Sequence, residues 1–460
     1  MRKIEDFPYE INPLYFIFKM GDIPFSFLLH SSMFHPQWGR YSIGGWHPSR
    51  VFSSKGLEFW WDGERRSGDP FQFLSRIYRE NSLPSFSPLP FIQGMVGYFA
   101  YDAGLILEDI PSLALDDLNL PDILLGFYEN VIVWDHIEKK AWVIYREERE
   151  KEFLWELLSK EKWISPQGEL GDFKSNFTKE GYMEAIRKAK EYIRQGDIYQ
   201  VNLSQRFSIR CSCSPLLYFL LLSRINPSFF SAYLNFPPLT VVSCSPERFL
   251  YLEKNVIQTR PIKGTRPRGR NKEEDEFFKR ELEESEKDKA ELVMIVDLER
   301  NDLGKISKKG TVRVKSLREI EAHPTVFHTV ATIEGEVKEK LTPVDILRAC
   351  FPGGSITGAP KIRAMQIIEE LEPTRRSVYT GSIGYISFHG RMDFNIAIRT
   401  IIFKEGYAYF QVGGGIVADS SPEKEYQETL DKGLGIMRTF EVLKDEKNLV
   451  EREILSISGN

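Results

Sequence analysis

Short runs rich in β-branched and aromatic residues set the fold class of this chain, because glycine, proline and aspartate repeatedly interrupt them. Residues 92–99 and 130–134 form two such runs early in the chain, and 381–388, 392–403 and 407–412 form three more near its end. Such runs predict antiparallel strands. Helical stretches lie between them without the regular alternation of a parallel α/β protein. We therefore predict an α+β fold.

The remaining elements follow from periodicity and capping residues. Apolar segments 14–18, 198–203 and 255–259 predict further strands, and 116–123 predicts a loop. Helices are predicted over 147–162, 178–193, 272–296, 343–350 and 360–370, with a last helix from about residue 422.

A proline- and glycine-containing stretch, 165–169, is the softest boundary in the chain. It divides the sequence into an N-terminal lobe, 1–165, and a second region, 172–450. With 460 residues, the chain exceeds one ordinary domain and can bury a large core.

Composition excludes several classes of protein. The net charge of −5 and the pI near 6.0 argue against a nucleic-acid partner, because such proteins carry a basic footprint. We find no uninterrupted apolar run of membrane-spanning length and no apolar signal segment at the charged N-terminus. Four scattered cysteines, including Cys211 and Cys213, predict packed thiols in a reducing cytosol, and we expect a cytoplasmic protein.

The stretch TRPIKGTRPRG, residues 259–269, contains Lys263 between proline-stiffened segments. Gly264 allows the main chain to approach a ligand, and Thr265 follows it. A desolvated lysine can act as a nucleophile, whereas a solvated loop lysine is the plainer interpretation.

Acidic residues at helical spacing form a second group of candidates. Glu425 and Glu428 lie three residues apart, and Asp288 and Glu291 repeat that spacing. Carboxylates from two helices make an oxygen-only site that suits Mg²⁺. Solvated charge on amphipathic helices is the alternative.

Other polar residues stand next to apolar strands. Glu247, after Pro246, is either a general acid with a raised pKa or a strand-end ion-pair partner. Arg399 either pairs with an internal acid or binds an anionic substrate. Gly413, Gly414 and Gly415 offer backbone donors to an anion. His328, within an apolar run, is by default a core histidine. These residues indicate an enzyme for a small polyanion.

Six motifs then occur in a specific order: SPERF, PIKGTRPRG, MIVDLERNDLGK, FPGGSITGAPKIRAM, YTGSIGYIS and GGGIVADSSPEKEYQET. Together they resemble the chorismate-utilising enzymes, strongly over 178–440 and more weakly over the first 150 residues. The resemblance implies a large sandwich of two antiparallel sheets with helices packed outside. It also implies that chorismate binds between the sheets.

The resemblance assigns roles by position. It implies that Glu291 and Glu428 are Mg²⁺ ligands, with Glu425 and Asp288 acting nearby through water. Glu247 would protonate the hydroxyl that departs from ring carbon 4. The backbone of Gly413, Gly414 and Gly415 would bind the ring carboxylate. Arg399 and Tyr379 would bind the enolpyruvyl carboxylate. The other residues implied to line the same pocket are Gly264, Thr265, Thr357 and His328.

Two positions separate the branches of this family. Water-adding members have a lysine base where this chain has Gln200, so that branch is disfavoured. Anthranilate-forming members typically have alanine where this chain has Lys263. Lysine there resembles the aminodeoxychorismate synthase branch, which implies covalent catalysis by Lys263. The anthranilate branch is the alternative.

The ammonia for such a reaction needs a source. The chain contains no Gly-x-Cys-x-Gly nucleophile turn, so the resemblance implies a separate glutamine amidotransferase subunit as a partner. A separate lyase would remove pyruvate.

The N-terminal lobe also resembles the family's L-tryptophan pocket. The matching segments read LLHSS from residue 28, RYSI from residue 40 and NPSFFS from residue 226. The residues implied to form the pocket are Ser31, Arg40, Tyr41, Ser42, Phe230 and Ser231. Phe229 departs from the family, which often has proline there, and buried core is the rival interpretation.

Overall fold

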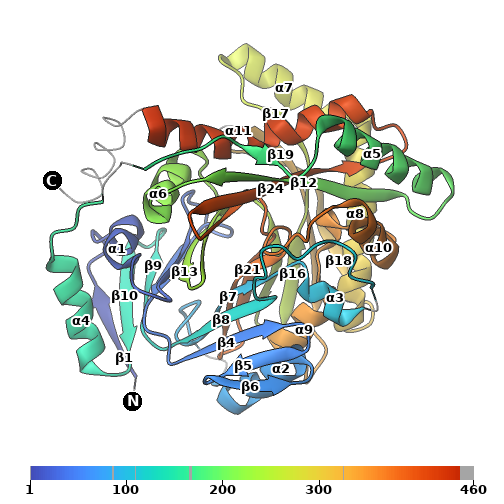
Figure 1. The fold of residues 1–460 in the computed structure, drawn as a ribbon. Helices are drawn as coiled ribbons and strands as arrows, with labels where there is room; N and C mark the ends of the chain where they lie inside the picture. The colour runs from blue at the N-terminus through green and yellow to red at the C-terminus, as the bar shows by residue number, and fades with distance from the viewer. Residues whose placement is uncertain (1, 85–86, 109, 165–167, 325, 446–460) are drawn as a thin grey trace.

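The computed structural model describes residues 2–84, 87–108, 110–164, 168–324 and 326–445. Within these residues, two twelve-stranded antiparallel sheets form the body of the protein, and helices pack around them (Figure 1). The predicted α+β sandwich is therefore confirmed.

The first sheet, in order of pairing, consists of β1 Lys3–Phe7, β10 Lys140–Tyr145, β9 Val131–Asp135, β3 Tyr41–Gly45, β2 Phe27–His30, β13 Phe230–Phe236, β14 Leu239–Ser245, β23 Thr400–Lys404, β24 Tyr407–Ile416, β12 Gln200–Arg210 and β11 Lys174–Ser175. The short strand β20, Gly358–Ala359, also pairs with β12.

The second sheet consists of β17 Ile262–Pro267, β19 Val326–Glu336, β16 Val256–Arg260, β15 Arg248–Glu253, β22 Met392–Asn395, β21 Ser382–Ser387, β7 Gly94–Phe99, β8 Ile123–Tyr128, β4 Arg50–Lys55, β5 Glu58–Trp61 and β6 Glu64–Ser67. Strand β18, Arg313–Ala322, pairs with β19. Strands from 1–165 and 172–450 thus share both sheets, and the division into two regions stays a prediction.

The helices are α1 Pro13–Met20, α2 Pro70–Asn81, α3 Ala103–Leu107, α4 Glu148–Ser159, α5 Lys179–Arg194, α6 Pro215–Ile225, α7 Lys272–Glu284, α8 Glu286–Ile306, α9 Pro343–Cys350, α10 Lys361–Leu371 and α11 Pro422–Asp445, with one 3₁₀ turn, η1 Gly354–Ile356. Polar caps start several of them; Thr342 and Asp345, for example, form a capping box at α9.

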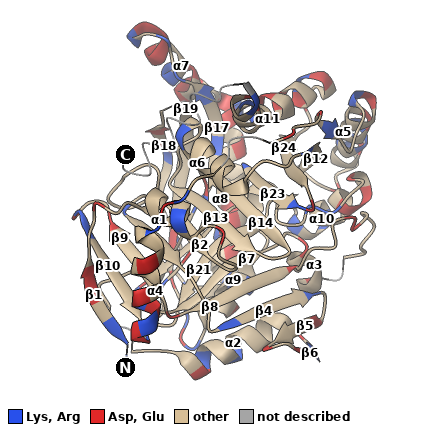
Figure 2. Cartoon of the chain, turned by 60° about the vertical axis from the view of Figure 1, so that its left-hand side comes forward, with Lys and Arg blue, Asp and Glu red and all other residues tan. Residues whose placement is uncertain are grey.

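Three layers of buried side chains hold these elements together. One lies between the sheets and includes Phe27, Val133, Tyr98 and Ile383. A second packs helices α1, α4, α6 and α11 on the first sheet. A third packs α2, α8 and α9 against the second sheet, and α5 and α10 against β12 at one end of the first. Many charged residues lie on the helices, including α7, which projects from the body (Figure 2). No helix of the described residues is both long enough and apolar enough to cross a membrane.

The prediction of a strand over 14–18 is wrong, because these residues belong to helix α1. The Asn12 side chain accepts the Tyr15 N–H at 2.8 Å, and Pro13 occupies the first turn. Phe16, Ile17 and Phe18 are all buried. A short apolar run of this kind does not distinguish a buried helix from a buried strand.

Two other predicted elements are divided in the structure. The helix predicted over 272–296 is two helices, because Ser285 ends α7 and its hydroxyl caps α8 by accepting the Asp288 N–H at 3.2 Å. The strand predicted over 392–403 is also two, since β22 lies in the second sheet and β23 in the first. The chain crosses between the sheets at residues 396–399.

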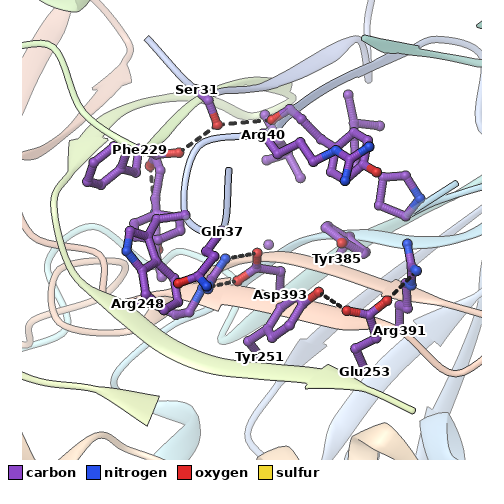
Figure 3. Close-up of a pocket in the computed structure, with 18 of the residues that line it drawn as sticks. Ser31, Gln37, Arg40, Phe229, Arg248, Tyr251, Glu253, Tyr385, Arg391 and Asp393 are labelled. Carbon is purple, nitrogen blue, oxygen red and sulfur yellow. Dashed lines mark hydrogen bonds and ion pairs between the residues drawn. The ribbon is translucent and has the colours of Figure 1, made fainter. Parts of the chain in front are cut away.

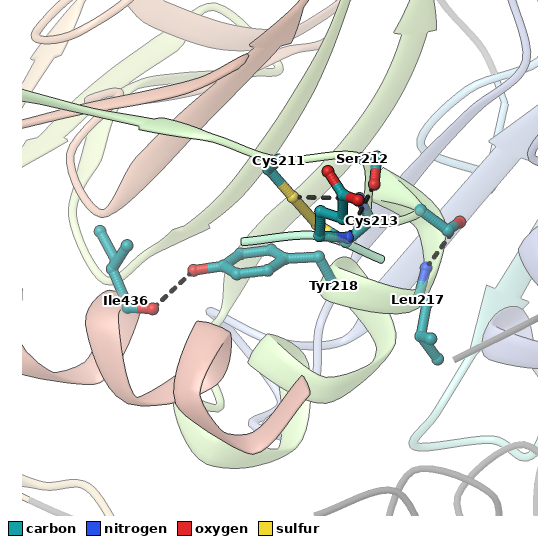
Figure 4. Close-up of a disulfide and its surroundings, with 8 residues drawn as sticks. Cys211, Ser212, Cys213, Leu217, Tyr218 and Ile436 are labelled. Atoms are coloured by element: carbon teal, nitrogen blue, oxygen red, sulfur yellow. Dashed lines mark hydrogen bonds between the residues drawn. A yellow bond between two sulfur atoms is a disulfide. The ribbon is translucent and has the colours of Figure 1, made fainter. Parts of the chain in front are cut away.

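The prediction of four packed thiols is wrong for one pair. Cys211 and Cys213 are joined by a disulfide (Figure 4), and the chain bends at Cys213 so that their Cα atoms lie 5.3 Å apart, within the usual range. Cys244 and Cys350 are buried free thiols, as predicted.

Candidate active site

Two crossings between the sheets lie side by side and carry Glu247 and Arg399. At the first, β14 of one sheet leads through residues 245–247 into β15 of the other; the second is 396–399. The Ile396 N–H donates to the Glu247 carbonyl at 3.0 Å, and the Cys244 N–H donates to the Arg399 carbonyl at 3.1 Å. The backbone thereby fixes both side chains in one region.

Glu247 is 5% exposed. Burial raises the pKa of its carboxyl above the usual value, while the Ser355 hydroxyl and the Lys263 charge oppose that shift. A carboxyl with a raised pKa keeps its proton at higher pH. This environment suits a general acid.

Lys263 lies on β17, and its Nζ donates a hydrogen bond to the Ser355 carbonyl at 3.2 Å. Burial lowers the pKa of the amine below its usual value, against the charges of Glu291 and Glu247. Gly264 then interrupts the pairing register with φ of 78°, and a Cβ there would lie 2.9 Å from Leu282. Lys263 is half-buried and its amine is hydrogen-bonded within the fold, so it is not a freely solvated loop charge.

Several polar atoms near Lys263 lack a hydrogen-bond partner among the described residues. They include the His328 Nε2 and the Thr329 hydroxyl, both buried. His328 Nδ1 lies 2.9 Å from the Thr265 hydroxyl, and burial lowers its pKa far enough to keep the ring neutral. Buried polar groups without partners are costly, so a polar ligand is the natural complement.

Arg399 adopts φ of 50° at the second crossing. Within the described ranges no carboxylate pairs with its guanidinium, and burial lowers its pKa. The predicted alternative, an ion pair between Arg399 and an internal acid, is therefore not found among the described residues. An anionic ligand would pair with the Arg399 guanidinium instead.

Thr357 and Tyr379 are both buried. The Thr357 hydroxyl donates to the Gly353 carbonyl at 3.0 Å, and burial raises the pKa of the Tyr379 phenol. Their roles as substrate contacts stay predictions.

The predicted acids come from the N-terminal ends of α8 and α11. Burial raises the pKa of Glu291 and of Glu425, and Ser420 donates to Glu425 at 2.7 Å. The Glu428 side chain is 46% exposed, and the Lys432 ammonium at 2.7 Å and other cations outweigh its partial desolvation and lower the pKa of that carboxyl. The negative charge of Glu428 contributes, after burial, to the raised pKa of Glu291.

These carboxylates offer oxygen donors only, which fits Mg²⁺ held by one or two acids and water. Among the described residues no group of three or more His, Cys, Asp or Glu side chains is arranged to hold a metal ion. Glu291 and Glu428 instead face Lys287, at 3.8 Å, and Lys432. A magnesium ion on these two acids would therefore depend on water and substrate oxygens for its other ligands.

Glycines 413–415 lie within β24, paired with β12, rather than after the strand. A Cβ at Gly415 would lie 2.1 Å from the Gln200 Nε2, and one at Gly414 would lie 3.2 Å from a Glu425 oxygen. Side chains are excluded, so the strand can approach both the acids and a ligand.

Sequence reasoning missed two residues here. Lys432 pairs with Glu428 and donates to the Gly413 carbonyl at 3.0 Å; its spacing of four residues after Glu428 was a usable signal. Ser355 contacts Lys263 through its carbonyl, and only its place in the FPGGSITGAPK motif pointed to it.

A separate cavity of about 600 Å³ lies between the sheets (Figure 3). Five of the six residues predicted for the tryptophan pocket line it: Ser31, Arg40, Tyr41, Phe230 and Ser231. Figure 3 shows the Ser31 hydroxyl, which lies 3.0 Å from both the Tyr41 and Phe229 carbonyl oxygens. Phe229, the residue that departs from the family, is part of the wall.

The sixth residue, Ser42, is not among those that line the cavity. Its hydroxyl lies 3.0 Å from His30 Nδ1 and 2.7 Å from His136 Nε2, and its side chain is completely buried. Side chains alternate along β3, so Ser42 points away from the face that carries Tyr41.

Comparisons with known proteins agree with this geometry. A family profile described as chorismate binding enzyme matches residues 26–438. The aminodeoxychorismate synthase component 1 of Bacillus subtilis (strain 168) is 39% identical, covering 89% of this chain and 91% of the relative. The anthranilate synthase component 1 of Acetivibrio thermocellus is 40% identical, covering 90% of each.

Among solved structures, the anthranilate synthase component I from Streptococcus pneumoniae TIGR4 has a TM-score of 0.77 and 34% identity, covering 87% of this chain and 92% of that one. The profile and these relatives span most of the sequence, including every predicted catalytic residue. The chain belongs to the chorismate binding enzyme family and is a chorismate-utilising enzyme.

Proposed function

We propose that the chain aminates chorismate at ring carbon 4 and gives 4-amino-4-deoxychorismate. The observation that carries this proposal is the half-buried Lys263 amine, which donates to the Ser355 carbonyl at 3.2 Å and has a lowered pKa beside the charges of Glu291 and Glu247. Relatives named for this reaction and for anthranilate synthesis are equally similar, so identity does not choose between the two. Lys263 is the residue that favours the first.

The reaction takes two steps. The neutral Lys263 Nζ bonds to ring carbon 2, both ring double bonds shift by one position, and the carbon 4 hydroxyl leaves as water with the Glu247 proton. Ammonia then bonds to carbon 4, both double bonds shift back, and the carbon 2–nitrogen bond breaks to release Lys263 as a neutral amine. The new carbon 4 ammonium returns one proton to the Glu247 carboxylate. The sum consumes chorismate and ammonia and yields 4-amino-4-deoxychorismate and water.

The surrounding residues would orient the substrate. Arg399 and Tyr379 would bind the enolpyruvyl carboxylate, with Thr357 and His328 beside it. The backbone of glycines 413–415 would donate to the ring carboxylate. Mg²⁺, held by Glu291 and Glu428 with Glu425 nearby, would neutralise that carboxylate when bound.

Two partners complete the proposal. A separate glutamine amidotransferase supplies ammonia, and L-tryptophan occupies the inter-sheet cavity as a structural ligand. The cavity supports the second point because its wall combines aromatic residues with polar groups on both sheets, and its volume exceeds that of one amino acid.

Product analysis tests the function directly. The purified chain would be incubated with chorismate, Mg²⁺ and ammonium, with and without an added aminodeoxychorismate lyase, and the products identified by mass spectrometry. We expect an amino intermediate that becomes para-aminobenzoate only when the lyase is present. Anthranilate together with released pyruvate would instead assign the chain to the tryptophan pathway.

A further inference from the structure

Three successive backbone carbonyls in the turn formed by residues 354–357 are held by three different elements. The Ser355 carbonyl accepts from Lys263 Nζ at 3.2 Å, and the Ile356 carbonyl accepts from Arg376 Nη1 at 2.9 Å. The Thr357 carbonyl accepts the Asn202 N–H of β12 at 2.8 Å. The conformation of this turn therefore decides which carbonyl faces the catalytic lysine.

Arg376 is almost completely buried, and its five N–H donors all have acceptors. Nε and Nη2 bind the two Glu372 carboxylate oxygens at 2.9 and 2.7 Å. The other three donors reach the Ile356 carbonyl at 2.9 Å, the Thr380 hydroxyl at 3.4 Å and the Asn202 carbonyl at 2.6 Å. The side chains of the pair are 1% and 2% exposed.

Glu372 is fixed in turn by β12. Its Oε1 accepts both the backbone N–H and the hydroxyl of Ser204, each at 2.8 Å. One ion pair thus connects β12, the 354–357 turn and the segment that carries Tyr379. The planar guanidinium can reach these acceptors together, whereas a lysine ammonium cannot match the same fork.

We propose that Arg376, held by Glu372, is a positioning residue that keeps the Ser355 carbonyl on the Lys263 amine. Because Arg376 fixes the next carbonyl along the chain, it fixes the orientation of the Ser355 peptide group. This inference rests on the proposed nucleophilic role of Lys263, and it assigns to Arg376 no contact with substrate.

Arg376→Lys tests the inference, with Arg206→Lys as the matched control. Arg206 is also a buried arginine in an ion pair, with Asp117, and lies on β12 four residues from Asn202. We expect Arg376→Lys to lower kcat on the order of 10- to 100-fold while KM for chorismate changes less than about threefold, as expected for a positioning effect. Arg206→Lys should alter neither.

A second measurement, the chemical labelling of Lys263, does not require the enzyme to turn over substrate. A carbonyl acceptor favours the charged amine, so its loss leaves more neutral Lys263 at neutral pH. Labelling of Lys263 by an amine-reactive reagent, followed by peptide mass spectrometry, should become several-fold faster in Arg376→Lys than in Arg206→Lys. Equal kcat and equal labelling in the two variants would overturn the inference.

Thr380→Val keeps the test decisive should Arg376→Lys not fold. It is isosteric and removes one acceptor from the Nη1 atom that holds Ile356, together with the hydrogen bond that the Thr380 hydroxyl donates to the Tyr379 carbonyl at 2.6 Å. We expect the same two effects at smaller size, and unchanged kcat and labelling would contradict the inference. Retained amination by Lys263→Ala would refute the nucleophilic role instead, while the labelling rates would still report on positioning.

Discussion

The region around Lys263 and the inter-sheet cavity are both built where the two sheets meet, yet their charges are arranged differently. In the cavity wall, Arg248 binds Asp393 at 2.7 Å, and Arg391 pairs with Glu253 (Figure 3). Near Lys263, the Arg399 guanidinium has no acidic partner in the part of the chain that the structure describes.

This difference separates the chemistry of the two regions. A guanidinium without a partner and buried polar atoms without hydrogen bonds favour binding of a polyanion such as chorismate. Most of the charged side chains that line the cavity are paired with an opposite charge, which suits a zwitterion. Glu247 and Arg248 are neighbours in sequence, and one belongs to the catalytic region whereas the other lines the cavity.

The largest effect should come from Lys263→Ala. Loss of a covalent nucleophile should lower the amination rate by at least about 1,000-fold, while Mg²⁺-dependent chorismate binding remains. Product formation measures the amination rate, and calorimetric titration measures chorismate binding. Lys254→Ala, in the cavity wall, is the control and should leave the rate unchanged. Full activity in Lys263→Ala would contradict the nucleophilic role of Lys263 and the difference in chemistry between the two regions.

Glu428→Gln should have the next largest effect. Loss of a metal-ligand charge should reduce activity about 10- to 100-fold and shift the Mg²⁺ titration to higher concentration. Glu253→Gln removes a carboxylate from the cavity instead and should leave the metal titration unchanged. An unaltered titration in Glu428→Gln would exclude it from the metal site.

The effect of pH on kcat/KM should be smaller than the effects of these two substitutions and larger than that of tryptophan. Glu247 must be protonated and loses its proton as pH rises, whereas Lys263 must be neutral and gains a proton as pH falls. The pKa of Glu247 is raised and that of Lys263 is lowered, so kcat/KM should follow a bell whose limbs lie closer together than the usual values of 4.5 and 10.5. A rate independent of pH across this interval would contradict both assignments.

The smallest effect on activity should come from the cavity. L-Tryptophan should raise the melting temperature without changing the amination rate, because a ligand at 100 times its Kd adds about 2.7 kcal/mol to the free energy of unfolding. Ser231→Leu should fill part of the cavity and abolish that stabilisation. Inhibition of amination by tryptophan would show that the two regions are coupled.

The sequence by itself determined the fold class and the family, and it named the candidate residues of the catalytic region. Strands such as β9, 131–135, have the β-rich composition that predicts them, and motifs around Lys263, Glu247 and Glu428 are local in sequence. Periodicity could not distinguish helix α1 from a strand, because both bury short apolar runs. The metal site and the substrate contacts stay predictions.

Only the tertiary structure decided how these residues meet. The crossings at 245–247 and 396–399 lie about 150 residues apart, and backbone hydrogen bonds between them bring Glu247 and Arg399 together. Arg376 reaches carbonyls 20 and 174 residues away. Such contacts depend on backbone groups that every residue possesses, so no side-chain pattern in the sequence specifies them.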